Sequence, residues 1–269
     1  MNRNKEKNTI LQWGIILGVV SLLPAGCGNN SSTGTALSEE SSLSAEAQYS
    51  SSIEVVSSSS ISVLSSSSEI VYGSLTDRRD GQIYKTVVIG TQTWMAQNLN
   101  YKVDSSWCYK NSVDSCAKYG RLYQWTAAMK MSVVYNAQYF GLADIEYQGV
   151  CPNEWHIPNQ NEWQILYNAV NANNGSEGVG TSIKTSNNWV YDEDTEVGNN
   201  SFGFSALPAG GRYNDGVFGG IGKSTFFWSS TEDTRYTANY WYLYYNIEYF
   251  FGRLTDDKKY PKSLRCLKD

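Results

Sequence analysis

Residues 82–96 read Gln-Ile-Tyr-Lys-Thr-Val-Val-Ile-Gly-Thr-Gln-Thr-Trp-Met-Ala. The run 82–89 is rich in β-branched and aromatic residues, which favour strands. Residues 90–92 supply a turn, and residues 93–96 continue as a second strand. Because Asp80-Gly81 adds turn chemistry just before this run, we expect the C-terminal domain to open with a β-hairpin.

Two helices are expected after this hairpin. The first is predicted from the helical spacing of Leu122, Trp125 and Met129. The second begins at Asn159, because Glu162 three residues later completes a capping-box pattern. Its inner face would carry Trp163, Leu166 and Val170.

The helical period ends after Ala172, and the remaining sequence favours loops and strands. A Gly- and Asn-rich stretch covers 173–200, and short strands are expected near 202–207, 224–229, 239–247 and 262–267. In Tyr240-Trp-Tyr-Leu-Tyr-Tyr245 both alternating positions are bulky, so both faces of this strand should meet other groups. A hairpin, two helices, irregular loops and antiparallel strands together predict an α+β domain.

The N-terminal end has the pattern of a secretion signal. Residues 1–9 carry Arg3, Lys5 and Lys7, and an apolar run extends over 10–23. About 20 apolar residues are needed to span a bilayer, so this run is better read as a removable signal.

Leu23-Pro24-Ala25-Gly26-Cys27 resembles the cleavage box of bacterial lipoproteins, in which the cysteine is lipidated and becomes the new N-terminus. This resemblance makes 1–26 a lipoprotein signal peptide and Cys27 the lipid attachment site, with Gly28 fitting an outer-membrane destination. The alternative is an ordinary secretory signal in which Cys27 has no role. We expect a lipid-anchored protein at the bacterial outer membrane or cell surface.

Residues 27–71 are expected to form a Ser-rich disordered tether. Five glutamates are the only charges in 28–70, and serine runs occur at 50–52, 57–60 and 65–68. Such a segment cannot bury enough apolar surface to offset the entropy of ordering. The domain proper is therefore assigned to 72–269.

The overall composition argues against nucleic acid as a partner. The chain has 26 acidic and 21 basic residues, giving a net charge of −5. Nucleic-acid binding depends on clustered Lys and Arg. The unusual feature is the aromatic content of 14%, with 20 Tyr and 9 Trp, because these side chains are enriched at interfaces.

Several ordered sequence blocks closely resemble the Fibrobacter succinogenes major paralogous domain (FISUMP). The longest is 77–101, and further blocks lie at 107–109, 116–123, 149–158, 204–213, 227–232 and 264–269. The resemblance covers 73–269. It implies a secreted or surface protein and no established general activity.

The Trp155-His-Ile-Pro158 block with its following Glu162-Trp163, and the Arg265-Cys266 end, also resemble the C-type lectin-like fold and its formylglycine-generating branch. This resemblance implies a C-type lectin-like domain with two helices, short antiparallel strands and a long irregular loop region.

Four cysteines remain after Cys27, and disulfides are the expected state in an exported domain. Three pairings are possible. Cys108–Cys116 would close a short loop, and Cys151–Cys266 would connect the start of the second helix to the last strand, as the lectin-like fold favours. A thiolate metal site is the rival reading, but no C-x-x-C step supports it.

No catalytic set is evident, so we expect no enzyme and no cofactor. The formylglycine-type branch uses two closely spaced cysteines, whereas Cys266 stands alone. His156, the single histidine, is expected to be structural. A glycosidase needs two carboxylates, but Glu162 is better explained as a helix cap, and Glu232 and Asp233 as turn residues. Asp192 and Asp194 could hold calcium, although a solvated acidic loop is the simpler reading and no metal site is assigned.

The aromatic side chains are then the candidate ligand-binding residues, and we expect some to be exposed together. They are Trp107, Tyr109, Tyr213, Trp228, Tyr236, Tyr240 and Trp241. The predicted function is a non-catalytic, lipid-anchored surface module that recognises a polysaccharide or a surface partner. The alternatives are an extracellular glycan-acting enzyme and a structural envelope lipoprotein.

Overall fold

The computed structural model describes residues 69–141, 145–173, 178–191, 193, 197–213 and 215–269. The signal peptide, Cys27 and nearly all of the tether lie outside these residues, as do Asp192 and Asp194. The described part is an α+β domain with mostly strands and few helices, as expected. No helix within it is long and apolar enough to span a membrane.

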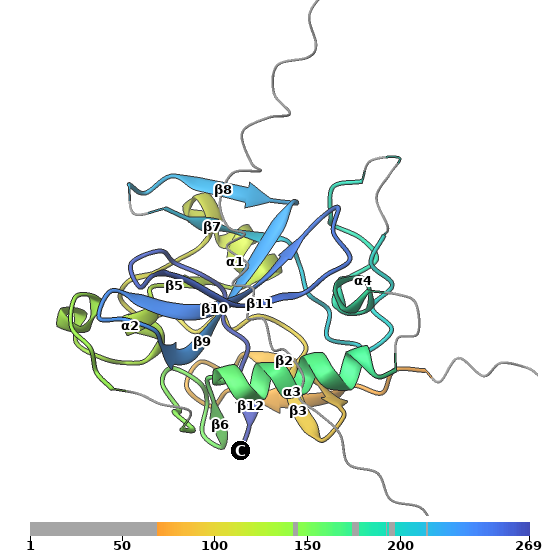
Figure 1. Cartoon of the computed structure of the whole chain (residues 1–269), viewed down its shortest axis with the longest axis horizontal. Coiled ribbons are helices and arrows are strands. Elements are labelled where there is room, and N and C mark those ends of the chain that lie inside the picture. Colours follow the sequence, from red (N-terminus) through yellow and green to blue (C-terminus); the bar gives the residue numbers. More distant parts are fainter. Residues whose placement is uncertain (1–68, 142–144, 174–177, 192, 194–196, 214) are drawn as a thin grey trace, which may run out of the picture. The chain divides into compact units, whose positions relative to one another are not determined.

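The elements follow one another along the chain as shown in Figure 1. They are β1 (Gly73–Thr76), β2 (Ile83–Ile89), β3 (Gln92–Met95), β4 (Ser106–Trp107), the 3-10 helix η1 (Tyr109–Asn111), α1 (Val113–Tyr119), β5 (Leu122–Tyr123), α2 (Trp125–Ala128), the 3-10 helix η2 (Val133–Asn136), β6 (Trp155–His156), α3 (Gln160–Asn171), α4 (Val179–Ile183), β7 (Ala209–Arg212), β8 (Phe218–Ile221), β9 (Ser224–Glu232), β10 (Thr237–Tyr244), β11 (Phe251–Asp257) and β12 (Leu267–Lys268).

The first sheet has the order β1-β2-β3-β12-β6. Its centre is the predicted hairpin, in which β2 and β3 pair antiparallel from Ile89 opposite Gln92. The C-terminal strand β12 lies between β3 and β6, where Leu267 is opposite both Trp94 and His156. The last strand therefore joins two parts of the sheet that are far apart in the sequence.

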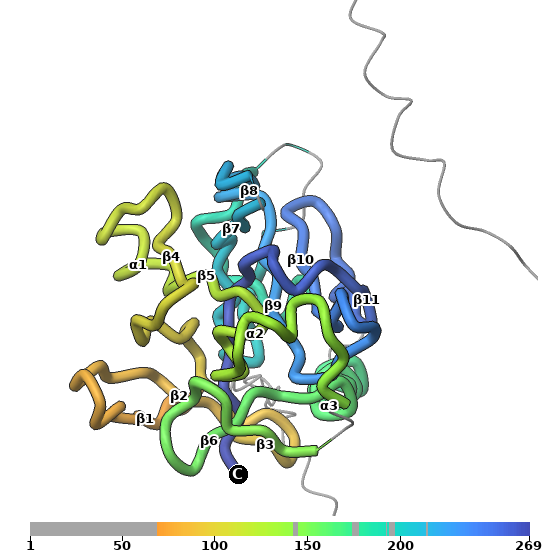
Figure 2. The backbone as a smooth tube through the Cα atoms, turned by 90° about the vertical axis from the view of Figure 1, so that its left-hand side faces the viewer, coloured from red at the N-terminus to blue at the C-terminus, as the bar shows by residue number. Residues whose placement is uncertain are grey.

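The second sheet has the order β11-β10-β9-β7-β8 (Figure 2). The antiparallel strands β9 and β10 form its centre, with Trp241 opposite Phe227 and Tyr242 opposite Phe226. The predicted strands near 224–229 and 239–247 are β9 and β10.

Helix α3 begins as the sequence predicts. The Asn159 side chain accepts hydrogen bonds from the backbone of Asn161 and Glu162, and the Glu162 carboxylate accepts one from the Asn159 backbone. Its buried face carries Trp163, Leu166 and Val170. Since α3 contacts β2 of the first sheet and β9, β10 and β11 of the second, its apolar face connects the two sheets.

Two clusters of buried side chains form the core. The second cluster is dense in aromatic rings around Trp163, whose ring centroid lies 4.7 Å from that of Trp94 and 6.1 Å from that of Trp241. The first cluster includes Trp125, Trp228 and the disulfide between Cys151 and Cys266. Aromatic pairs of this kind contribute stability beyond the area they bury.

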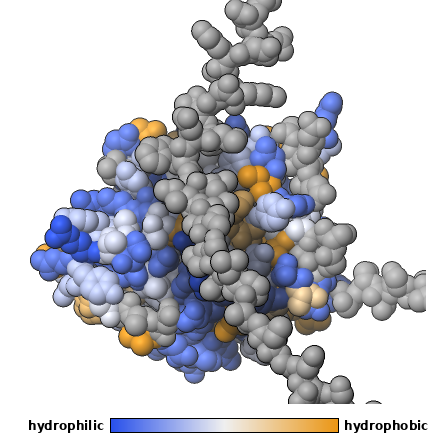
Figure 3. All heavy atoms as spheres, viewed as in Figure 1, coloured by the Kyte–Doolittle hydropathy of each residue, from blue (hydrophilic) through white to orange (hydrophobic). Residues whose placement is uncertain are grey.

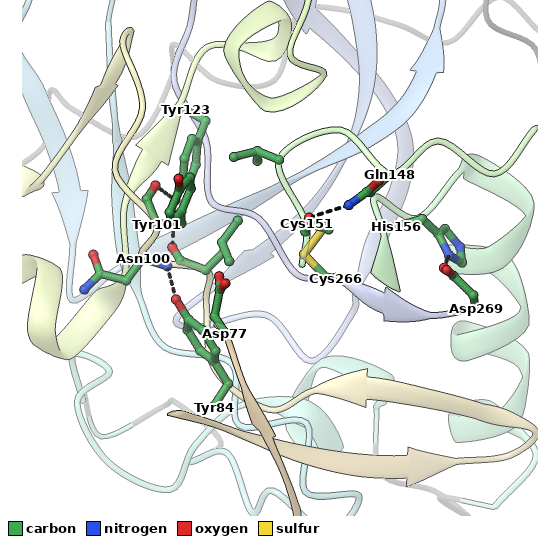
Figure 4. Close-up of a disulfide and its surroundings, with 12 residues drawn as sticks. Asp77, Tyr84, Asn100, Tyr101, Tyr123, Gln148, Cys151, His156, Cys266 and Asp269 are labelled. Atoms are coloured by element: carbon green, nitrogen blue, oxygen red, sulfur yellow. Dashed lines mark hydrogen bonds and ion pairs between the residues drawn. A yellow bond between two sulfur atoms is a disulfide. The ribbon is translucent and has the colours of Figure 1, made fainter. Parts of the chain in front are cut away.

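The two disulfides are Cys108–Cys116 and Cys151–Cys266, so disulfide bonding is confirmed. The second bond lies in the first core cluster, and Cys266 directly precedes β12 (Figure 4). Because all four thiols outside the lipidation box are consumed, a thiolate metal site does not form from them.

Next to Cys266, the buried Arg265 is held by neutral acceptors. Its Nη1 donates to the carbonyl oxygens of Met95 and Phe204, at 2.9 and 2.6 Å, and its Nε donates to Asn98 Oδ1. The guanidinium also lies over the Phe204 ring. The Arg265-Cys266 pair thus fastens the C-terminal segment to both β3 and the 204–205 segment.

Three predicted elements differ from the structure. The helix expected around 122–129 is confirmed only in part: α2 covers Trp125–Ala128, whereas Leu122 lies in β5 and the longer helix α1 precedes it. The strand expected near 202–207 is reduced to a bridge between Ala206 and Lys184. Along 262–267, isolated bridges and the start of β12 replace a continuous strand.

Instead of two helices, the described residues contain four α-helices, of which α4 lies within the predicted loop region. These differences arise where elements are short. A helix of four to seven residues has too few turns for a periodic signal, and tertiary contacts decide its formation.

Candidate functional site

Three of the seven candidate aromatic residues are buried, which corrects the expectation that they face a ligand. Trp228 is 0% exposed, Trp241 2% and Tyr109 6%. The Trp228 indole donates to the carbonyl of Tyr123, and the Trp241 indole donates to Gln160 Oε1. Their polar atoms are satisfied inside the protein, so these rings belong to the core.

The other four candidates are at least partly accessible to solvent. Trp107 is half-buried beneath the Arg212 guanidinium. Tyr236 is exposed in the turn between β9 and β10, where it packs against Arg235. Tyr240 lies on the central strand β10, and Tyr213 is exposed with its ring 6.5 Å from that of Tyr260.

A more continuous group of rings lies on the second sheet, on the side of β10 opposite Trp241. Side chains alternate between the two faces of a strand. In β10, Trp241 and Leu243 enter the second core cluster, whereas the alternate tyrosines are half-buried. We call this surface the aromatic face, and define it as Phe226, Tyr240, Tyr242, Tyr244 and Phe251.

Ring packing across the strands keeps the aromatic face in order. The Tyr242 ring is stacked between Phe226 of β9, at 4.9 Å between centroids, and Phe251 of β11, at 6.2 Å. A ring with neighbours on both of its faces presents its edge to solvent. The middle of the aromatic face therefore offers edges and hydroxyl groups, and its margin offers exposed rings.

The tyrosine hydroxyls of this surface are free to bind. Those of Tyr240, Tyr242 and Tyr244 form no hydrogen bond with any residue that the structure describes. Burial raises the pKa of Tyr240 from its ordinary value of 10.0 to about 12. Burial raises the pKa of Tyr242 more than that of Tyr240. Both phenols stay neutral at physiological pH, so each can donate and accept a hydrogen bond.

A buried lysine contacts the rings of the aromatic face. Lys262 Nζ is 4.5 Å from the Tyr240 ring centroid and pairs with Asp256 Oδ2 at 2.5 Å. Burial lowers the pKa of Lys262, and Asp256 opposes this shift. The cation–π contact and the ion pair hold the lysine against these rings.

The carboxylates considered for acid–base chemistry have structural partners. Glu232, expected in a turn, instead ends strand β9 fully buried, where it pairs with Lys258 Nζ at 2.6 Å. Glu162 caps α3, as predicted. Asp233 lies in the turn after β9, as expected, and accepts from the Thr237 hydroxyl.

His156 connects two carboxylates. Its Nε2 lies 2.8 Å from Glu162 Oε1, and its Nδ1 lies 2.7 Å from Asp269 Oδ1 (Figure 4). Burial alone would lower the pKa of His156, but the hydrogen bonds to both carboxylates outweigh burial and raise it above 6.5. Glu146, His156 and Asp269 are close enough to share a metal ion, yet both ring nitrogens are already engaged.

Sequence reasoning missed four of the five residues of the aromatic face. Tyr242 and Tyr244 could have been found, because they alternate with Tyr240 along one strand. Phe226 could not have been found in this way, because only the β9–β10 register places it opposite Tyr242. Phe251 lies opposite Tyr242 only because the β10–β11 pair contains a register shift. Figure 3 shows one face of the molecule, on which hydrophilic residues predominate.

These features define a disulfide-linked α+β domain with an aromatic sheet face. The chain belongs to the family of the Fibrobacter succinogenes major domain, whose model matches residues 87–268. The resemblance seen in the sequence blocks is thereby confirmed. Comparison with curated proteins and with solved structures finds no significant match.

Proposed function

We propose that this chain is a non-catalytic surface module that binds polysaccharide through the aromatic face. The observation that carries the proposal is the row of packed rings with unengaged tyrosine hydroxyls. Sugars present apolar C–H faces together with hydroxyl groups. A surface of exposed rings and phenols matches both. Because the rings are already packed against one another in the free protein, less side-chain entropy is lost on binding.

The partners of the acidic residues support a non-catalytic role. A glycan-acting enzyme needs two carboxylates at a suitable separation across a substrate. Glu232 is fully buried against Lys258, and Glu162 is committed to a helix cap and to His156. None of the five residues of the aromatic face is acidic, and Asp256 beside it is paired with Lys262.

The C-type lectin-like fold is part of this proposal. Two observations support it: the first and last strands share one sheet, and Cys151–Cys266 links the segment before α3 to the C-terminal end. The proposal also places the protein at the bacterial outer membrane or cell surface, anchored by lipid on Cys27 and extended by the tether 27–71. That part rests on the sequence pattern of the lipoprotein cleavage box.

Binding to polysaccharides tests this function. The full-length chain in detergent would be incubated with cellulose, xylan, chitin and peptidoglycan. We expect Tyr244→Ala to weaken binding about tenfold, since truncating an interface aromatic typically costs about 1–2 kcal/mol. Tyr242→Phe keeps the ring and removes only the hydroxyl, so its effect should be smaller.

Tyr139→Ala is the matched control, because Tyr139 is exposed and lies outside the aromatic face. Thermal unfolding of each variant would show that the fold is intact. The proposal is wrong if no polysaccharide binds, or if Tyr244→Ala and Tyr139→Ala bind equally well. If the chain binds a surface protein and no polysaccharide, that protein is the partner and the polysaccharide part of the proposal is wrong.

A further inference from the structure

A pocket opens where the aromatic face reaches the edge of the second sheet. Its volume is about 300 Å³, at the lower end of the range for small-ligand sites. Helix α3 contributes Gln164 and Tyr167, and the segment before and within β11 contributes Tyr249, Phe251 and Arg253. Phe251 belongs to both surfaces, so the pocket, which opens on the Trp241 side of β10, adjoins the aromatic face at this edge of the sheet.

The floor of the pocket is rigid. It includes an edge of Trp241, whose indole nitrogen donates to Gln160 and whose ring stacks on Trp163. Gly252 lies directly over this ring, and a Cβ at position 252 would overlap Trp241. Glycine at this position therefore lets the β11 backbone approach the tryptophan and keeps the pocket in its shape.

Arg253 at the pocket is chemically distinct from the cations in the interior. Lys258 and Lys262 pair with carboxylates, and Arg265 donates to carbonyl and amide oxygens. Arg253 is exposed and forms no ion pair or hydrogen bond with any described residue. A guanidinium is suited to bidentate binding of a carboxylate.

Tyr249 provides the second recognition group. Its side chain is 55% exposed, and its ring centroid lies 6.0 Å from that of Phe251. An exposed ring beside an unpaired guanidinium suits a flat group that carries a carboxylate. A uronic acid residue has this combination, with a sugar face for Tyr249, hydroxyls for Gln164 and a carboxylate for Arg253.

We infer that the pocket selects acidic polysaccharide, with Arg253 binding the carboxylate of a uronic acid residue. This inference rests on the proposed function and adds a chemical class of ligand to it. The charge of Arg253 determines the preference for acidic polysaccharide, and the aromatic face supplies the part of the binding that does not depend on charge.

The test compares two polymers that differ only in charge. Binding of the full-length chain to polygalacturonate and to its methyl-esterified form would be measured by calorimetry. We expect the acidic polymer to bind at least about tenfold more tightly and to weaken as salt rises. Arg253→Gln should remove this preference, so that the two polymers bind with about equal affinity.

Arg78→Gln is the matched control, because Arg78 is an exposed arginine in the turn after β1, on the other sheet. It should keep the preference for the acidic polymer. Equal binding of both polymers by the unmodified protein, or an unchanged preference in Arg253→Gln, overturns the inference while the proposed function stands. Absence of binding to these and all other polysaccharides overturns both, and stronger binding to polyglutamate would identify an acidic peptide as the occupant instead.

Discussion

Among single residues, position on a strand decides what an aromatic side chain does. Trp241 and Tyr242 are neighbours in sequence, yet Trp241 lies in the core and Tyr242 lies on the aromatic face. Trp228 and Tyr240 lie opposite each other on neighbouring strands, yet Trp228 is a buried member of the first core cluster, whereas Tyr240 packs against that cluster and stays partly exposed. Composition indicates that many rings are present, and only the fold determines which of them are accessible.

His156 leads to a prediction about pH. It is the only histidine in the chain, and its pKa in the folded protein is raised above 6.5 by Glu162 and Asp269. A raised pKa means that the folded state holds this proton more tightly than the unfolded state. The stabilisation should be complete below pH 6.5 and should disappear as the pH rises through the folded-state pKa.

Urea unfolding of the unmodified protein and of His156→Gln, at intervals from about pH 5 to about pH 9, would measure this effect. We expect the difference in unfolding free energy to be largest at the acidic end and to shrink toward the alkaline end. A difference that stays constant across this range would show that protonation of His156 does not contribute.

For whole elements, the sequence predicts best where local signals agree. Helix α3 combines a capping box with an apolar face, and its start is predicted correctly at Asn159. Helix α1 has no side-chain cap, and Cys116 within it is held by the disulfide to Cys108. Its stability depends on a covalent link to a residue outside the helix, which residue periodicity does not report. For the same reason the aromatic face could be predicted only in part, because strand registers bring Phe226 and Phe251 to Tyr242.

The buried pair of Glu232 and Lys258 holds the segment 135–141 against the second sheet. Glu232 accepts from the backbone of Phe140 and Gly141, and Lys258 donates to the carbonyls of Tyr135 and Gln138. Removing one partner leaves the other uncompensated in the interior. We expect Glu232→Gln to destabilise the protein by about 3–5 kcal/mol.

Chemical unfolding would measure this loss, and hydrogen exchange at the amides of Phe140 and Gly141 would show release of the segment. Asp233→Asn makes the same change of acid to amide at the neighbouring exposed residue, and should have a much smaller effect. Equal effects of the two substitutions would contradict a special role for the buried pair.

The two disulfides constrain the whole molecule to different extents. Cys108–Cys116 spans 8 residues of sequence, whereas Cys151–Cys266 spans 115. Loop-closure entropy predicts a contribution of about 2–3 kcal/mol for the short loop and about 5 kcal/mol for the long one. The double variant Cys151→Ala/Cys266→Ala should therefore unfold at a lower urea concentration than Cys108→Ala/Cys116→Ala.

Thermal and urea unfolding of both double variants would check this order, with the disulfide state of each verified by mass measurement. The reverse order, or equal loss of stability, would show that packing around each pair outweighs the effect of loop length.

The central position of β12 in the first sheet also bears on how the protein is made. While the ribosome is still adding residues, β3 and β6 have no strand between them, and Cys151 has no partner. The nascent chain can form the early hairpin and α3, but it cannot close its sheet until 264–268 have been synthesised. A nascent chain that stops before these residues exposes two unpaired strand edges to chaperones and proteases.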